Sequence, residues 1–457
     1  MNENTEELKD DYIPLRDGKV SSLLTKFAVP SIVAMLVGSI YNIVDQYFIG
    51  QCVGVSGNAA TNIAFPLAMC CTAIALLAGI GGASNFNLSM GRGHKDIAGY
   101  YIGNAIIMLA VLGTILGVGT KIYLDRILYA FGSPEDVLPY ARTYVGITSI
   151  GFPYLILTIG GGHLIRADGS PRIAMACNMS GAVINTVLDY IFVMKLGFGM
   201  AGAAWATVIG QIVSTVIVII YIMHFKTVKL EAKHFKPNFG YMARISSIGA
   251  ASFVNQLAMM LVQVVMNNSL KYYGALSKYG AGDPIAASGI IIKTFQLFFA
   301  VVIGLSQGSQ PIISYNYGAG NYRRVKETYL RSIAVGAAVT IFAEILFQTI
   351  PGRLLGIFGE GSPGYFEFGI RYFRIYLMLM FINFLQPISS TFFTSIGKPV
   401  KGIFLSLTRQ IIYLLPALVI LPRFFGIDGI LYCGPVADAL SFITVIILLV
   451  IEFKNMK

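Results

Sequence analysis

The sequence is short of charge. Only 12% of its 457 residues are Asp, Glu, Lys or Arg, against 56% that are hydrophobic. Soluble proteins carry roughly 25% charged residues, so a chain this long cannot cover a water-facing surface with what it has. A glycine period, a sustained heptad and a cysteine-rich framework are also missing, which excludes a collagen, a coiled coil and a disulfide scaffold.

Motifs for several kinds of chemistry are absent as well. The five cysteines (Cys52, Cys70, Cys71, Cys177 and Cys433) show no metal-ligand spacing and are interpreted as small buried hydrophobes. Glycine-rich stretches lack the Lys-Ser/Thr of a nucleotide-binding loop, and no metal cluster or selectivity-filter loop is evident. These absences disfavour an ATP-driven pump, a membrane enzyme and a channel, and we expect no cofactor.

Long apolar runs dominate what is present. Runs of about 20 residues or more span hydrocarbon, whereas a membrane β-barrel needs short alternating segments. Twelve candidate spans lie at about 24–50, 58–86, 97–120, 138–162, 173–195, 201–224, 243–270, 284–313, 326–350, 368–395, 401–421 and 429–452. The chain is therefore predicted to be an all-α, polytopic membrane protein.

The basic residues predict its orientation. If the N-terminus is cytoplasmic, 21 of the 33 Lys and Arg residues fall in inside segments, which the positive-inside rule favours. We expect a multi-pass protein of the cell (inner or plasma) membrane with both termini in the cytoplasm. Basic loops against anionic lipid also account for the net charge of +11, so no nucleic-acid partner is needed.

The two halves of the chain resemble each other. Gly91-Arg92-Gly93-His94 matches Gly318-Ala319-Gly320-Asn321, Asp168-Gly169-Ser170-Pro171 matches Ile396-Gly397-Lys398-Pro399, and Gly199 to Ala203 matches Gly426 to Ile430, all at offsets of 227 or 228. Six spans per copy make the repeats parallel, a plan that secondary transporters use to rock two lobes about a midplane site. The predicted parts are a tail (1–22), an N-lobe (23–224), a cytoplasmic inter-lobe loop and hinge (225–242), a C-lobe (243–452) and a second tail (453–457).

Two carboxylates in the first half fall at one depth. Asp45, Asp189 and Thr207 each lie five or six residues from the outer end of a span, roughly 8 to 10 Å below the surface. Tyr41 and Asn185 stand four residues before the two aspartates, on the same helix faces. Because buried carboxylates are costly and raise each other's proton affinity, this set is a plausible proton switch. Na⁺ is an alternative, since all these groups are oxygen ligands, and so is an aspartate that only hydrogen-bonds a broken helix.

Other polar residues within the spans are weaker candidates. The repeat carries Asp189 to Ala417 and Asp45 to Val265, so coupling is predicted to be asymmetric. Lys293 is interpreted either as a competitor of a cationic substrate or as a structural partner, and Asp438 as a secondary candidate site. Glu344 and Arg409 are expected to stabilise their own lobe, and His163 to be solvated near a helix end.

Several motifs in one order resemble the multidrug and toxic compound extrusion (MATE) family over about residues 20–452. They are Asp45 to Gly50, Arg166 to Pro171, Asn185 to Asp189, Gly202 to Thr207 and, most like the MepA-like branch, Gln310 to Gly320. The resemblance implies twelve helices in two lobes around a central cavity, and a monomer that exports cationic or amphipathic drugs in exchange for H⁺ or Na⁺. It also implies a cation site at Tyr41, Asp45, Asn185, Asp189, Ala203 and Thr207.

The sequence departs from another branch of that family, in which carboxylates of the seventh and tenth spans bind Na⁺. Here Asn383 stands in the tenth span, and Asn255, Gln256 and Gln263 are neutral residues of the seventh. Gln256 and Asn383 are kept as secondary site candidates. The alternative function is a flippase for lipid-linked precursors, which requires a strongly cationic cavity; few basic residues lie inside the spans.

Overall fold

Helices form all of the regular structure that is described. The computed structural model describes residues 13–131, 133–135, 137–280, 282–356 and 362–456, and within these ranges it contains no strand. Of the predicted tails, residues 1–12 and 457 lie outside the described part. The prediction of an all-α protein is confirmed.

The first lobe contains six membrane-length helical segments. They are α2 (Val20–Cys52), α3 (Val55–Gly91), α4 (Lys95–Ile122), α6 (Leu138–Ala167), α7 (Pro171–Asp189) continued by the π-helical turn η1 (Tyr190–Lys195), and α8 (Gly199–Met223). Two short helices, α1 (Ile13–Asp17) and α5 (Leu124–Ala130), accompany them.

The second lobe repeats this plan. Its segments are α9 (Phe239–Ala275), α10 (Gly282–Gly318), α11 (Tyr322–Thr349), α13 (Pro363–Arg371) with η3 (Tyr372–Tyr376), α14 (Met380–Asn383) and α15 (Leu385–Ser395), α16 (Pro399–Leu407) with η4 (Thr408–Leu414) and α17 (Leu415–Phe425), and α18 (Ile427–Asn455). Short α12 (Pro351–Gly356) precedes α13. The described part thus holds eleven helices able to cross a membrane, and twelve spans when the bent pair around residue 378 counts as one.

The tenth span is bent rather than straight. Its two parts, Pro363–Tyr376 and Met380–Ser395, meet at 51°. A break inside hydrocarbon needs partners for the freed backbone groups. Glu344 of α11 supplies one, accepting from the Met380 backbone N–H at 3.2 Å, and Gln348 donates to the Arg374 carbonyl at 3.2 Å. The predicted role of Glu344 within its own lobe agrees with this contact.

The internal repeat is visible in the backbone. Gly93 and Gly320 both end helices in the left-handed region, with φ of 82° and 74°, as do Gly169 and Gly397 with 81° and 72°. Glycine takes this conformation without steric cost. At each site the following residue donates its N–H to the carbonyl five positions earlier, for example Ser170 to Ile165 at 3.2 Å and Lys398 to Phe393 at 2.9 Å. Sequence matches at offsets of 227 and 228 therefore mark equivalent helix ends.

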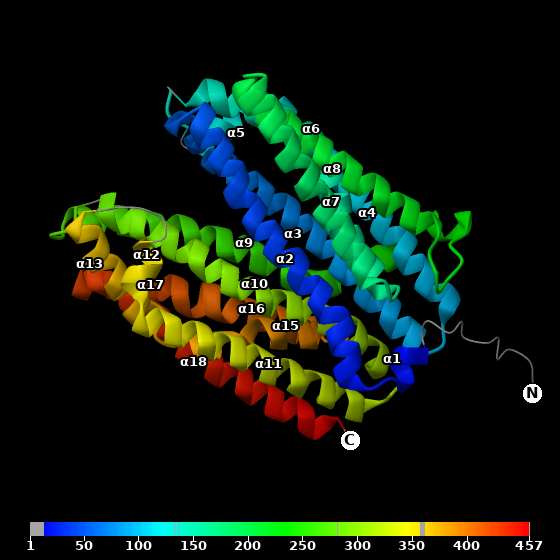
Figure 1. Ribbon diagram of the computed structural model, residues 1–457. Coiled ribbons are helices and arrows are strands. Elements are labelled where there is room, and N and C mark those ends of the chain that lie inside the picture. Colours follow the sequence, from blue (N-terminus) through cyan, green and yellow to red (C-terminus); the bar gives the residue numbers. More distant parts are fainter. Residues whose placement is uncertain (1–12, 132, 136, 281, 357–361, 457) are drawn as a thin grey trace, which may run out of the picture.

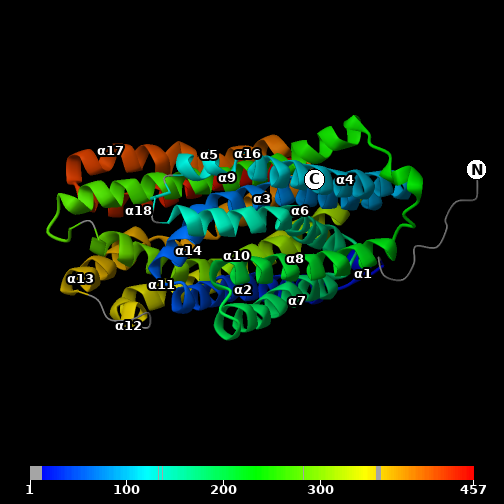
Figure 2. The same cartoon turned by 90° about the horizontal axis from the view of Figure 1, so that it is seen from above.

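The two lobes approach each other closely at one end only. Figure 1 shows them nearest at the end with α1 and the C-terminus, here named the closed end, and farther apart toward α5 and α13, here named the open end. Seen at 90°, the long helices of both lobes run along one common direction (Figure 2). Contacts between the lobes run mainly through α3 with α9 and α10, and through α2 with α10.

Glycines make the closed-end contact possible. In α3, Gly81 faces the Ile245 carbonyl and Gly91 the Tyr315 carbonyl so closely that an added Cβ would overlap the backbone. Gly308 against Ala28 and Gly318 against the Leu88 carbonyl are the same contacts in the other copy. This glycine seam, together with Gly249 against Leu77 and Gly304 against Ile32, joins the lobes backbone to backbone. When each contact is matched to its counterpart in the other repeat, residues of α2 correspond to residues of α9 at an offset of 217, not the 220 expected from the sequence. At this offset the C-lobe equivalent of Asp45 is Val262.

The inter-lobe loop is attached to the N-lobe. Asp168 accepts hydrogen bonds from Tyr221 at 2.7 Å, from the Lys226 N–H at 2.8 Å and from the Thr227 hydroxyl at 2.5 Å. Further along, Lys233 pairs with Asp96 of α4 at 2.8 Å, and the Asn238 N–H donates to Asn104 at 2.8 Å. The connector is therefore held against the N-lobe as far as Asn238, and the start of α9 continues this contact through Tyr241, which stacks on Tyr100, and Arg244, which donates to the Tyr101 hydroxyl at 3.4 Å.

Candidate functional site

Asp45 and Asp189 meet inside the N-lobe. Asp45 lies in α2, seven residues before that helix ends, and Asp189 is the last residue of α7. Their side chains are 8% and 0% exposed, and the two carboxyl groups are within hydrogen-bonding reach of each other. Since an ionised carboxylate has no proton to donate, this contact is a hydrogen bond only when one of the two is protonated.

The pair is short of donors. Within the described residues no donor reaches Oδ1 of Asp45 or either carboxylate oxygen of Asp189, and Oδ1 of Asn185 is also without a partner. Buried oxygens are normally hydrogen-bonded, because leaving one unpaired costs about 1 to 3 kcal/mol. Four unpaired oxygens in one small volume are suited to hold a proton or a cation.

Neutral oxygen groups surround the two carboxylates. Asn185 donates to Thr207 Oγ1 at 3.2 Å, and Ala203 is fully buried one turn before Thr207 in α8. The hydroxyls of Tyr41 and Tyr144 also lie within reach of Thr207. The structure thus brings Tyr41, Asp45, Asn185, Asp189, Ala203 and Thr207 to one place, from α2, α7 and α8.

Tyr144 was missed by the sequence analysis. It lies in α6 close to Asp45 and Asp189. It is one of 25 tyrosines, and tyrosines within spans are interpreted first as core or lipid-facing residues. No periodicity or spacing distinguishes it, because its role depends on how α6 is rotated against α2.

The secondary candidates lie elsewhere. Lys293 of α10 donates to Gln46 of α2 at 3.1 Å, which places a C-lobe cation beside the residue that follows Asp45. Asp438 forms a buried ion pair with Arg409 of η4 at 2.6 Å, so its first partner is within its own lobe. Gln256 and Asn383 do not approach the aspartate pair but line a cavity between the lobes.

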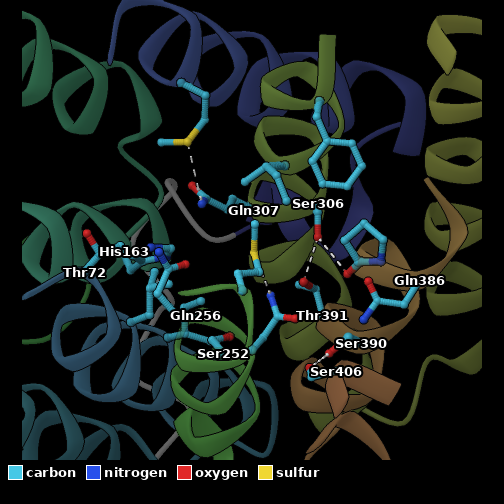
Figure 3. A pocket seen from close by; sticks show the side chains of 18 of the residues that line it. Thr72, His163, Ser252, Gln256, Ser306, Gln307, Gln386, Ser390, Thr391 and Ser406 are labelled. Carbon is cyan, nitrogen blue, oxygen red and sulfur yellow. Dashed lines mark hydrogen bonds between the residues drawn. The ribbon is translucent and has the colours of Figure 1, made fainter. Parts of the chain in front are cut away.

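That cavity has a volume of about 370 Å³, the lower part of the range for small-molecule sites. Both lobes line it, the N-lobe through α2, α3, α6 and α7 and the C-lobe through α9, α10, α14, α15, α16 and η4. In Figure 3, Thr72, His163, Ser252 and Gln256 lie on one side and Ser306, Gln386, Ser390, Thr391 and Ser406 on the other. None of Tyr41, Asp45, Asn185, Asp189, Ala203 and Thr207 lines this cavity.

Two cavity residues differ from the sequence predictions. His163, expected to be solvated, is 2% exposed and lines the cavity. Arg166, counted among the basic residues of a loop, is 3% exposed in the last turn of α6 and lines it too. The reason is that α6 continues to Ala167, five residues beyond the predicted end of its apolar run.

Comparisons with known proteins agree with this architecture. The family model MatE matches residues 30–191 and 251–419, once in each lobe. Multidrug export protein MepA of Staphylococcus haemolyticus (strain JCSC1435) is 25% identical over 435 residues, covering 94% of each chain. The protein of the same name from Staphylococcus aureus (strain N315) is 24% identical over 422 residues, or 92% of this chain and 91% of that one.

Solved structures share the fold. A MOP superfamily transporter from Pyrococcus furiosus superposes with a TM-score of 0.91 at 19% identity, over 99% of both chains. An outward-facing multidrug resistance MATE family transporter of the MOP superfamily gives 0.91 at 19% identity, over 99% of this chain and 100% of that one. The twelve-span, two-lobe prediction is confirmed. The chain belongs to the MatE family, as a MepA-like MATE transporter and not an enzyme.

Proposed function

We propose that this protein is a secondary active antiporter that exports amphipathic organic compounds, organic cations among them, in exchange for H⁺ or Na⁺. Coupling is assigned to the Asp45–Asp189 pair. The observation that carries the proposal is the buried contact between two carboxyl groups, three of whose four oxygens are buried with no donor among the described residues. We further propose that it works as a monomer in the cell membrane with both termini in the cytoplasm.

The ion and the substrate bind at separate places. Tyr144, beside the aspartate pair, and Arg166, in the cavity lining, are both on α6 and 22 residues apart, about 33 Å along the helix. A small molecule held at Arg166 does not reach the pair, although the cavity extends to Met35 of α2 and Asn178 of α7, which lie ten residues from Asp45 and seven from Asn185. Coupling must then act through the equilibrium between the two arrangements of the lobes. Each ligand shifts this equilibrium only by the difference between its affinities for the two arrangements.

The position of the pair indicates how the ion acts. Asp45 lies about two turns before the end of α2 that leads to the open end, so we assign ion entry to the side on which the lobes diverge. Loading of an ion there relieves the repulsion between the carboxylates and favours a tighter packing of α2 against α7 and α8. Release toward the opposite side restores the repulsion. We assign the coupling to this N-lobe site because the repeat places apolar residues, Val262 and Ala417, at the equivalent positions of the C-lobe.

The flippase alternative requires several cations for a pyrophosphate. Two arginines line the cavity, but Arg409 is neutralised by Asp438. Arg166 alone remains without a counter-ion among the described residues. One uncompensated cation does not suit a ligand with two or more negative charges, so drug export is the better-supported function.

Purified protein in liposomes tests the proposal. Accumulation of a fluorescent amphipathic dye is followed under a pH gradient and, separately, under a Na⁺ gradient. We expect one gradient to drive accumulation and Asp45→Asn and Asp189→Asn each to lower it at least tenfold, with dye affinity changed less than threefold. Asp125→Asn, which breaks an exposed ion pair with Arg142 in the same lobe, is the matched control and should transport normally. Normal transport by both site variants would overturn the assignment.

A further inference from the structure

The inter-lobe cavity has an unbalanced charge. Its lining includes Arg166, Arg409 and His163, and none of the lining residues in the described part of the chain is Asp or Glu. Export of cations alone does not explain this, because a cationic ligand would meet like charge and no counter-ion. The distribution of charge in the lining therefore bears on the substrate class.

Only one of the two arginines is compensated. Arg409 and Asp438 are 12% and 1% exposed and 2.6 Å apart, so this pair presents little net charge. Arg166 is 3% exposed and has no charged or hydrogen-bonding partner among the described residues. Asp168, two residues later, is occupied by Tyr221 and by Lys226 and Thr227 of the connector. Arg166 therefore keeps a full positive charge in a buried site.

A second unpaired group lies beside it. His163 precedes Arg166 by one helical turn, so the two side chains share a face of α6. Nδ1 of His163 is buried and has no hydrogen-bond partner among the described residues. In Figure 3 His163 lies next to Thr72 and Gln256 on one wall of the cavity. A buried charge and a buried polar atom that both lack partners are costly unless a ligand supplies them.

The rest of the lining suits an apolar body. Phe295 and Phe299 stack with ring centroids 4.9 Å apart, and Met259, Ile80 and Ile159 complete an apolar surface. Aromatic and methionine side chains adapt to varied ligands by dispersion contacts. The cavity thus pairs one cationic point with an apolar wall.

We propose that this cavity binds amphipathic compounds that carry a single carboxylate, with the carboxylate on Arg166, His163 beside it and the apolar part against Phe295 and Phe299. A guanidinium forms two parallel hydrogen bonds with a carboxylate, which gives both affinity and orientation. One uncompensated charge matches a monoanion, or the anionic half of a zwitterion. The inference refines the substrate class of the proposed export function.

Equilibrium binding to the purified, full-length protein in nanodiscs tests it without any ion gradient. Three probes share one fluorophore and differ in charge: dansyl-phenylalanine, a carboxylate; its methyl ester, which is neutral; and dansylcadaverine, an ammonium cation. For the wild type we expect dansyl-phenylalanine to bind at least fivefold more tightly than either of the others.

Variants of Arg166 test whether the preference for the carboxylate probe depends on this residue. Arg166→Gln should weaken binding of dansyl-phenylalanine about tenfold or more and leave the ester within twofold, whereas Arg166→Lys should retain most of the preference. Arg172→Gln removes an exposed arginine near the start of α7 and is the matched control. Equal affinity of the wild type for carboxylate and ester, tighter binding of the cation, or an unchanged preference in an Arg166→Gln variant that still binds the ester would overturn the proposal.

A second variant decides the matter if Arg166→Gln no longer binds the ester. Asn178→Asp adds a carboxylate to the lining and should abolish the preference for dansyl-phenylalanine while the ester still binds; an unchanged preference would overturn the proposal. Because no gradient is used, a failure of ion coupling leaves the contrast between the probes intact. A failure of the contrast likewise leaves the coupling assignment standing.

Discussion

Single side chains decide how the N-lobe site is completed. Tyr144 enters it from α6, where its hydroxyl lies within reach of Thr207 and close to both aspartates. A phenolic hydroxyl can donate to a carboxylate or accept from a neighbour, so it can follow the change of charge when an ion is bound or released. Its position makes it a positioning residue for the pair.

We expect Tyr144→Phe to lower gradient-driven dye accumulation about three- to tenfold and to shift the pH at which transport is half-maximal, because the variant keeps the ring and removes only the hydroxyl. Initial rates in liposomes across pH 5.5 to 8.5 measure both effects. Tyr140→Phe, an exposed tyrosine one turn earlier on α6, is the control. A lower rate with an unshifted pH profile would contradict a role at the ion site.

A variant of Asp438 tests whether this residue forms a second coupling site or only the ion pair with Arg409. Removing one partner of a buried ion pair leaves the other charge unpaired and costs about 3 to 5 kcal/mol. We therefore expect Asp438→Asn to lower the thermal midpoint of the purified protein, and Arg409→Met in the same chain to recover most of the loss. Unchanged stability together with abolished coupling in Asp438→Asn would show that Asp438 is a coupling residue and not a structural partner.

Residue-level prediction from the sequence was successful where depth was sufficient. Equal distance from the span ends selected Asp45, Asp189 and Thr207, and the i, i+4 spacing added Tyr41 and Asn185. These residues lie together, although their role in coupling stays a prediction. Depth does not report helix rotation, so Tyr144 was missed. Nor does hydropathy report that α6 continues past residue 162, which hid His163 and Arg166 among supposed loop residues.

At the scale of helices, the glycine seam sets how closely the lobes approach. Six contacts, related in pairs by the repeat, place backbone against backbone at the closed end. Backbone contact between helices needs small residues, and a single added methyl group has no space to occupy. The seam therefore stabilises the arrangement in which this end is shut.

We expect Gly249→Ala to shift the protein toward the arrangement with this end open. Its new methyl group would overlap the Leu77 carbonyl, and overpacking costs about 1 to 3 kcal/mol, or about tenfold in population for each 1.4 kcal/mol. Spin labels at the exposed positions Arg92 and Arg323, in a cysteine-free background, report the distance between the lobes at this end. Gly289→Ala in α10, with no atom within 4 Å of the added Cβ, is the control. Identical distance distributions for both variants would contradict the account of the seam.

The elements themselves were largely predictable. All twelve apolar runs correspond to spans, because each is long enough to cross hydrocarbon. The bend in the tenth span was not predictable, because residues 368–395 form one continuous apolar run. The break depends on Glu344 and Gln348 of another helix, α11. The π-helical turns η1, η3 and η4 likewise leave no signal in a hydropathy pattern.

At the scale of the whole molecule, the proposed ion site is asymmetric and lies within a symmetric frame. The repeat relates helix ends, glycine turns and seam contacts of both lobes. The carboxylate pair occurs in the N-lobe only, and the unpaired cavity arginine is on an N-lobe helix as well. We therefore assign ion binding to one lobe and propose that the other lobe responds through the shared seam and cavity.

The most direct test of that account measures dye and ion movement in the same vesicles. Liposomes with trapped pH-sensitive and Na⁺-sensitive indicators receive a fluorescent amphipathic substrate on one side, and both signals are recorded together. We predict that substrate movement is accompanied by a counterflow of one of the two ions, that Asp45→Asn and Asp189→Asn abolish this counterflow, and that Asp125→Asn preserves it. Substrate movement without any ion counterflow in the wild type, or an undiminished counterflow in both aspartate variants, would contradict the claim that this pair couples export to an ion.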